Sequence, residues 1–128
     1  MIEKMIVEIK KHLPLTIVNV EWSGDIFTFS GSKWSFSTVS AWRIVKEGRV
    51  DYACFDKDTE IELNGILGKE IINISFQSVL LKIDPVFFLS DGRALEIFAT
   101  DTYEPWTFHI DELGTYVATP SDPAAFDI

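Results

Sequence analysis

The side chains best suited to acid–base chemistry gather in the C-terminal third of the sequence. His109 lies close in the sequence to Asp101, Glu104 and Asp111. A histidine beside carboxylates can exchange protons with a substrate near neutral pH, because its ordinary pKa is about 6.5. Acidic residues are so dense in this region that their proximity to one histidine is expected by chance. We therefore keep a small enzyme or ligand-binding domain, using acidic residues around His109, as an alternative hypothesis.

The remaining candidates for catalysis or metal binding lack the partners that such chemistry needs. Cys54 has apolar neighbours, which favours a buried structural thiol over a nucleophile in an electropositive setting. His12 and His109, the two histidines, lie far apart in the sequence, without the close ligand spacing typical of a zinc site. The sequence therefore predicts no catalytic residue, no metal and no cofactor.

One acidic segment deserves comparison with a cation site. Its carboxylates alternate through Asp56, Asp58, Glu60 and Glu62. A calcium loop requires a glycine at its sixth position for a sharp turn, and Ile61 stands at that position. We therefore interpret the segment as a solvated, charged stretch rather than a calcium loop.

Acidic charge is distributed unevenly along the chain. Residues 84–128 contain nine acidic residues and one basic residue, Arg93, whereas residues 1–83 contain eleven acidic and ten basic residues. The formal net charge of the whole chain is −9. Such a field repels phosphate backbones and anionic lipids and attracts basic partners. The sequence therefore predicts a basic protein partner, and neither nucleic acid nor membrane.

The segment 100–106 places acidic residues beside Tyr103 and Trp106. Aromatic anchors ringed by charge suit a protein interface. Equally, Trp106 could be a core residue and the nearby acids ordinary loop residues, because Trp106 alternates in phase with Phe108 and Ile110. We predict a partner-binding face formed by Asp101, Tyr103, Glu104, Asp111 and Glu112, with Trp106 in the core.

Length and composition predict a single domain, residues 1–128, with one real hydrophobic core, since 47% of the residues are hydrophobic. The lone Cys54 cannot form an internal disulfide. Charged residues interrupt the N-terminal stretch, so it lacks the apolar core of a signal peptide. No apolar run approaches the roughly 18–20 residues of a membrane span. We therefore expect a cytoplasmic protein.

The N-terminal segment has the spacing of an amphipathic helix. Ile2, Met5, Ile6 and Ile9 recur at intervals of three and four residues, which places them on one face of a helix. Pro14 ends the pattern, because the residue before a proline is disfavoured in the helical conformation. The sequence therefore predicts a helix over about 2–12.

After Pro14 the apolar period changes to two, which is typical of half-buried strands. The candidate strands are 18–22, 27–30, 34–37, 41–45, 50–55, 72–76, 79–83, 95–99, 106–110 and 116–118. Pro85 suggests an edge position or a bulge. Residues 56–68 fit either a strand or a short helical turn. Asp58 or Thr59 could cap such a turn, and Thr59 with Glu62 fits a capping box; we favour the helical turn.

These elements define the expected fold class. An apolar helix stripe needs a sheet face to cover it. We predict an α+β domain in which the N-terminal helix packs on an antiparallel sheet or meander of about seven to nine short strands. The tail, about 119–128, contains two prolines and is expected to be loosely ordered.

Four short stretches resemble a known family. They are LNGILGKEI at 63–71, FLSDG at 88–92, LEIF at 95–98 and YEPW at 103–106. Together they resemble small bacterial immunity proteins of toxin–immunity systems, including contact-dependent growth inhibition. The similarity covers about residues 63–108, roughly a third of the chain. It implies that the protein binds and blocks a co-encoded toxin, often a basic nuclease, by occlusion and without catalytic residues.

The charge pattern and the resemblance support the same hypothesis. An acidic surface accelerates association with a basic partner through electrostatic steering. We therefore predict a non-catalytic acidic binding protein, an immunity protein that occludes a basic bacterial toxin.

Overall fold

The computed structural model describes residues 2–80, 82–99 and 104–119. The described elements begin with helix α1 (Ile2–Lys10). They continue with β1 (Leu15–Thr16), β2 (Asn19–Trp22), β3 (Phe27–Ser30), β4 (Trp34–Thr38), β5 (Ala41–Lys46), β6 (Arg49–Ala53), α2 (Thr59–Glu62), the 3-10 helix η1 (Leu63–Ile66), β7 (Glu70–Phe76), β8 (Pro85–Leu89), β9 (Ala94–Phe98), β10 (Trp106–Ile110) and β11 (Gly114–Val117).

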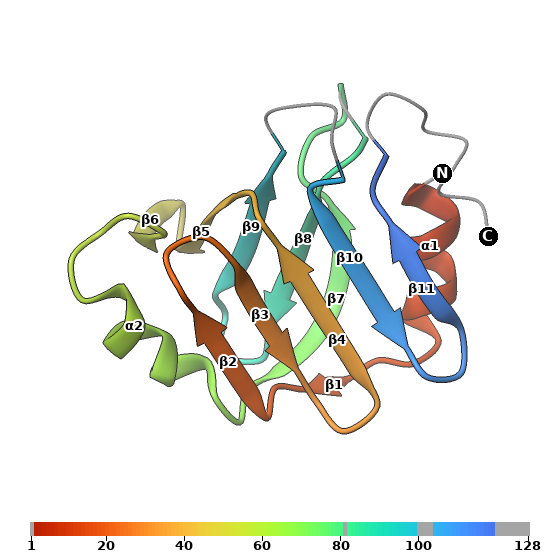
Figure 1. Cartoon of the computed structure of the whole chain (residues 1–128), viewed down its shortest axis with the longest axis horizontal. Coiled ribbons are helices and arrows are strands. Elements are labelled where there is room, and N and C mark those ends of the chain that lie inside the picture. Colours follow the sequence, from red (N-terminus) through yellow and green to blue (C-terminus); the bar gives the residue numbers. More distant parts are fainter. Residues whose placement is uncertain (1, 81, 100–103, 120–128) are drawn as a thin grey trace.

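The strands form two antiparallel sheets (Figure 1). The first sheet has the order β1-β7-β8-β9-β5-β6, and the second has the order β11-β10-β4-β3-β2. The α+β class and the N-terminal helix are confirmed. The expectation of one sheet or meander with seven to nine strands is wrong, because the described residues form 11 strands in two sheets. Alternation shows which face of a strand is buried, but not to which sheet the strand belongs.

Aromatic side chains join the inner faces of the two sheets. Phe27 of the second sheet stacks on Trp42 of the first, with ring centroids 4.4 Å apart. Phe29 and Phe36 both contact the ring of Phe87, at centroid distances of 5.3 and 4.9 Å. The shared faces of Phe27 with Phe29, and of Trp34 with Phe36, were expected from the sequence; the contacts to Trp42 and Phe87 were not. The hydrophobic core therefore lies between the sheets.

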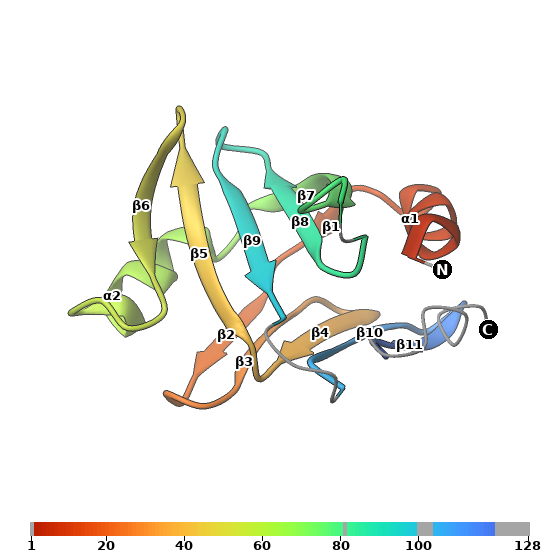
Figure 2. The ribbon, with the colours of Figure 1, turned by 90° about the horizontal axis from the view of Figure 1, so that it is seen from above.

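The helix α1 lies at one end of the two-sheet structure, next to β11 and in contact with β7 (Figures 1 and 2). Its predicted apolar stripe, Ile2, Met5, Ile6 and Ile9, is buried, which confirms the helical periodicity. The helix ends at Lys10, two residues before the expected boundary, and the chain continues as a turn. No helix among the described residues has both the length and the apolar character needed to cross a bilayer.

The strand predicted at 79–83 is wrong. Val79 and Leu80 are exposed, and the described residues between β7 and β8 belong to no strand. The Gln77 N–H donates to the Asp84 carbonyl oxygen at 2.7 Å and brings the two ends of this segment together. The edge position expected for Pro85 is wrong, because β8 lies between β7 and β9. Pro85 is the first residue of β8, a position that suits a residue without an N–H donor.

The helical turn favoured for residues 56–68 is confirmed as α2 followed by η1. The predicted capping box does not form. Asp58, the other expected cap, stands at the N-cap position but makes no side-chain cap hydrogen bond. Thr59 is the first residue inside the helix, and its side chain is buried. Its hydroxyl donates toward the carbonyl oxygens of Ala53 at 2.9 Å and Asp56 at 2.8 Å, which ties the start of α2 to the end of β6.

Candidate functional site

The three predicted partner-binding residues that the structure describes do not form one cluster. Glu104 precedes β10, whereas Asp111 and Glu112 follow it, and all three are exposed. At about 3.3 Å per strand residue, the two groups lie roughly 20 Å apart. Asp101 and Tyr103 lie outside the described residues. Trp106 is confirmed as a core residue, since its exposed fraction is 1%.

Several acidic residues in the C-terminal part of the chain form hydrogen bonds or ion pairs with other residues of the protein. Glu96 accepts a hydrogen bond from Arg43 at 2.6 Å. The Asp91 carboxylate lies 2.7 Å from the Arg93 guanidinium. Burial alone would raise the pKa of Asp91, but the hydrogen bonds from Arg93 lower it below its usual range. The sequence count therefore overstates how much negative charge this part of the chain presents to solvent.

Asp84 is a third acidic residue whose carboxylate bonds within the protein. It is buried, and its Oδ2 accepts the Ala99 backbone N–H at 2.6 Å. Burial raises the pKa of this carboxyl, because the charged form loses hydration in the protein interior. The hydrogen bond from Ala99 offsets only part of that effect. Asp84 is thus a structural group between the two sheets and not part of an exposed acidic face.

His109 lies between a hydroxyl and a carboxylate. Its Nδ1 is 2.9 Å from Thr115 Oγ1, and its Nε2 is 3.0 Å from Asp111 Oδ1. The register of β10 with β11 places Thr115 directly opposite His109, which sequence proximity did not reveal. A hydroxyl, an imidazole and a carboxylate in this order can activate a nucleophile. However, the side chains of His109 and Asp111 are 42% and 58% exposed, so water screens the electrostatic effects that catalysis uses.

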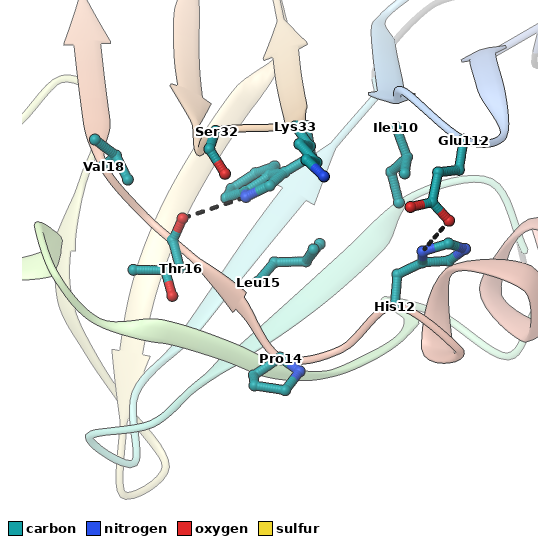
Figure 3. Close-up of a pocket in the computed structure, with 10 residues that line it drawn as sticks. His12, Pro14, Leu15, Thr16, Val18, Ser32, Lys33, Ile110 and Glu112 are labelled. Carbon is teal, nitrogen blue, oxygen red and sulfur yellow. Dashed lines mark hydrogen bonds and ion pairs between the residues drawn. The ribbon is translucent and has the colours of Figure 1, made fainter.

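A pocket of about 310 Å³ lies beside the start of β1 (Figure 3). The His12 Nδ1 and the Glu112 carboxylate face each other at 3.8 Å on one side. The Trp34 indole N–H donates to the Thr16 carbonyl oxygen at 3.2 Å on the other. Lys33 contributes a cation to the rim. This volume is at the lower limit for small-molecule sites, about 300–1,000 Å³, and the indole donor is already used within the protein.

Among the described residues, several carboxylates without an ion-pair partner lie at the opposite end of the molecule from α1, around β2 and α2 (Figure 1). Two adjoining hollows, of about 330 and 310 Å³, share Trp22 and Glu60. They lie between β2 on one side and α2 with η1 on the other. We call this site the acidic groove, and it is lined by Val20, Glu21, Trp22, Asp56, Asp58, Thr59, Glu60, Ile61, Leu63 and Asn64.

The lining of the acidic groove contains four carboxylates and neither lysine nor arginine. All four carboxylates are exposed. Asp56 accepts the Ala53 backbone N–H at 2.8 Å. Within the described ranges, Glu21, Asp58 and Glu60 have no ion-pair partner. Their negative charge is therefore directed to solvent, in contrast to that of Asp84, Asp91 and Glu96.

Apolar side chains border these carboxylates. Trp22 is half-buried and packs edge-on against Trp42, with centroids 5.5 Å apart. Phe55 contacts the Trp22 ring at 6.2 Å and is 83% exposed. Ile61 is 68% exposed. Large apolar groups surrounded by charge resemble the core and rim of a protein interface.

Only one wall of the acidic groove could be recognised in the sequence. The alternating acids from Asp56 to Glu62 stood out, but they were interpreted as a solvated stretch. Nothing in the sequence placed Trp22 and Glu21 opposite them, since the pairing depends on how α2 packs. Among the residues that the structure describes, no group of three or more His, Cys, Asp or Glu side chains could hold a metal ion.

Comparisons with family models, with curated proteins and with solved structures found no match for this chain. The resemblance to immunity proteins therefore stays a prediction, and the inference of function depends on the chain's own geometry and charge.

Proposed function

We propose that this protein is a non-catalytic acidic binding protein whose acidic groove binds a basic protein. The observation that carries the proposal is the set of uncompensated carboxylates, Glu21, Asp58 and Glu60, beside the exposed Phe55 and Ile61. Charge attracts and orients a basic partner, and apolar contact then slows its release. Neither step requires a reactive side chain.

Within this proposal, the partner is a co-encoded bacterial toxin, and the protein acts as its immunity protein in the cytoplasm. Inhibition by occlusion requires a folded surface that complements the toxin and covers its active site. Two packed sheets with an aromatic core supply a rigid support for such a surface. The C-terminal acids Glu104, Asp111 and Glu112 remain candidates for a second region of contact.

Growth rescue tests the proposal. The protein encoded beside this chain, expressed alone, should stop growth of a bacterial host, and co-expression of this chain should restore growth. The variant Glu21→Lys with Glu60→Lys should fail to restore growth while accumulating to the same level in its folded form. A neighbouring protein that is harmless to the host, and that does not bind this chain when both are purified, would contradict the proposal.

The arrangement around His109 favours a second candidate function, a small hydrolytic enzyme that uses Thr115 as the nucleophile. The contacts at 2.9 and 3.0 Å are its support. A His109→Ala variant separates the two functions. Loss of biological activity in a well-folded His109→Ala protein would favour the enzyme, and full activity would favour the binding protein.

A further inference from the structure

We propose, on the basis of the proposed function, that the partner inserts an extended basic segment into the acidic groove and that this segment adds to β2 as a new strand of the second sheet. The partner is thus recognised partly through its backbone. This mode of binding combines main-chain hydrogen bonds, which give affinity, with side-chain contacts, which give specificity.

The strand β2 has an open side. It is the outermost strand of the second sheet and pairs only with β3 within that sheet. A strand at the edge of a sheet presents unpaired N–H and C=O groups that can pair with another chain. In β2, this open side faces the acidic groove, because Val20, Glu21 and Trp22 line it.

The turn after β2 shows which backbone groups are free. The Ser23 N–H donates to the Ile26 carbonyl oxygen at 3.2 Å. Backbone bonding alternates along an antiparallel pair, so Glu21, two residues earlier, also bonds to β3. The N–H and C=O groups of Val20 and Trp22 therefore point away from β3, toward the acidic groove. These groups can bond to an added strand about 4.8 Å away.

The other sheet edges fit a basic strand less well. The strand β1 has only two residues. The strand β11 lies in front of α1 (Figure 1), and α1 carries the exposed cations Lys4 and Lys10. The hollow beside β6 has a lining of balanced charge, because Glu47 and Asp51 stand beside its two cations. It therefore does not select a basic segment. The edge of β2, in contrast, adjoins four carboxylates, and the lining that the structure describes there has no lysine or arginine.

The groove also specifies the side chains of the inserted segment. Successive residues of a strand point to opposite faces. In β2, Glu21 projects from one face, and Val20 and Trp22 project from the other. Basic residues on one face of the added strand can reach Glu21, while Asp58 and Glu60 approach from the side of α2. A segment of about four to six residues with alternating lysine or arginine matches this length and charge.

The test uses a capped synthetic peptide of alternating lysine and valine as the probe. Its binding is measured by calorimetry, and backbone hydrogen exchange is followed at Val20 and Trp22. We expect the peptide to bind and to slow exchange at both amides. A peptide of the same sequence, methylated on every backbone nitrogen, keeps its lysine charges but loses its backbone N–H hydrogen-bond donors. We expect its affinity to be at least about tenfold weaker, and we expect no protection of Val20 or Trp22.

Two double charge reversals locate the contact. Glu21→Lys with Glu60→Lys should weaken peptide binding at least about tenfold, because like charges then face each other across the groove. Glu8→Lys with Glu47→Lys makes the same change in net charge outside the groove lining and should leave the affinity within about twofold. Both variants should melt within a few degrees of the wild-type protein.

The outcomes separate this inference from the proposed function. Equal binding of the methylated and unmethylated peptides would overturn strand addition and leave only electrostatic attraction. Absence of peptide binding, or binding without protection of Val20 and Trp22, would also overturn it. Growth rescue that still depends on Glu21 and Glu60 would then show that the proposed function survives without strand addition.

Discussion

Replacing Trp106 by alanine tests the assignment of this residue to the core. Complete burial of an aromatic side chain removes about 150–250 Å² from water, which corresponds to about 4–6 kcal/mol at about 25 cal/mol per Å². Alanine keeps part of this contribution, and the cavity that forms beside Phe36 adds a cost. We therefore expect Trp106→Ala to lower the free energy of unfolding by about 3–5 kcal/mol.

The assay is chemical denaturation followed by far-ultraviolet circular dichroism, which does not depend on the fluorescence of the residue removed. At this chain length, about 4 °C per kcal/mol corresponds to a fall of about 12–20 °C in melting temperature. Trp22→Ala is the matched control, because Trp22 is half-buried and should cost clearly less. A loss below about 1 kcal/mol for Trp106→Ala would refute the assignment to the core.

Three further predictions follow from the charges and the candidate catalytic groups. Burial raises the pKa of Asp84 in the folded protein above its value of about 3.8 in the unfolded chain. As pH rises, Asp84 therefore loses its proton in the unfolded chain before it does so in the folded protein. The free energy of unfolding falls over that pH range, until the pH passes the folded pKa. Asp84→Asn should therefore gain stability relative to wild type between about pH 3.5 and 7 in pH-dependent denaturation, and a difference that does not change with pH would contradict the account. His109→Ala and Cys54→Ser should retain partner binding in calorimetry if they fold, whereas loss of binding in either folded variant would point to a direct role. Association with the partner should slow as salt rises, because screening acts over about 8–10 Å; a salt-independent on-rate in stopped-flow experiments would argue against steering by the acidic groove.

The alternation of side chains made the buried faces of many strands predictable. Phe27 and Phe29, like Trp106 and Phe108, repeat at the period of two that a half-buried strand requires, and all four are buried. The partners of the strands were not predictable in the same way. β4 pairs with β10 across a long stretch of chain, and that pairing depends on how the whole molecule closes.

The candidate site was less predictable than the fold, for two physical reasons. A count of charges along the chain does not show which carboxylates meet an arginine, as Asp91 and Glu96 do. The acidic groove also joins residues from β2 and α2, so no local pattern contains both sides of it. The strand predicted from the apolar alternation at 79–83 does not form, because local alternation cannot show whether a segment packs on the core. Val79 is exposed and lies outside the strands.

The affinity of this chain for the protein encoded beside it, measured by calorimetry, tests the central proposal most directly. The comparison is between Glu21→Lys with Glu60→Lys and Asp111→Lys with Glu112→Lys. We expect the first pair to weaken binding at least about tenfold and the second to have a smaller effect. Unchanged affinity for the first pair, with an unchanged melting temperature, would contradict the assignment of the acidic groove as the partner-binding site.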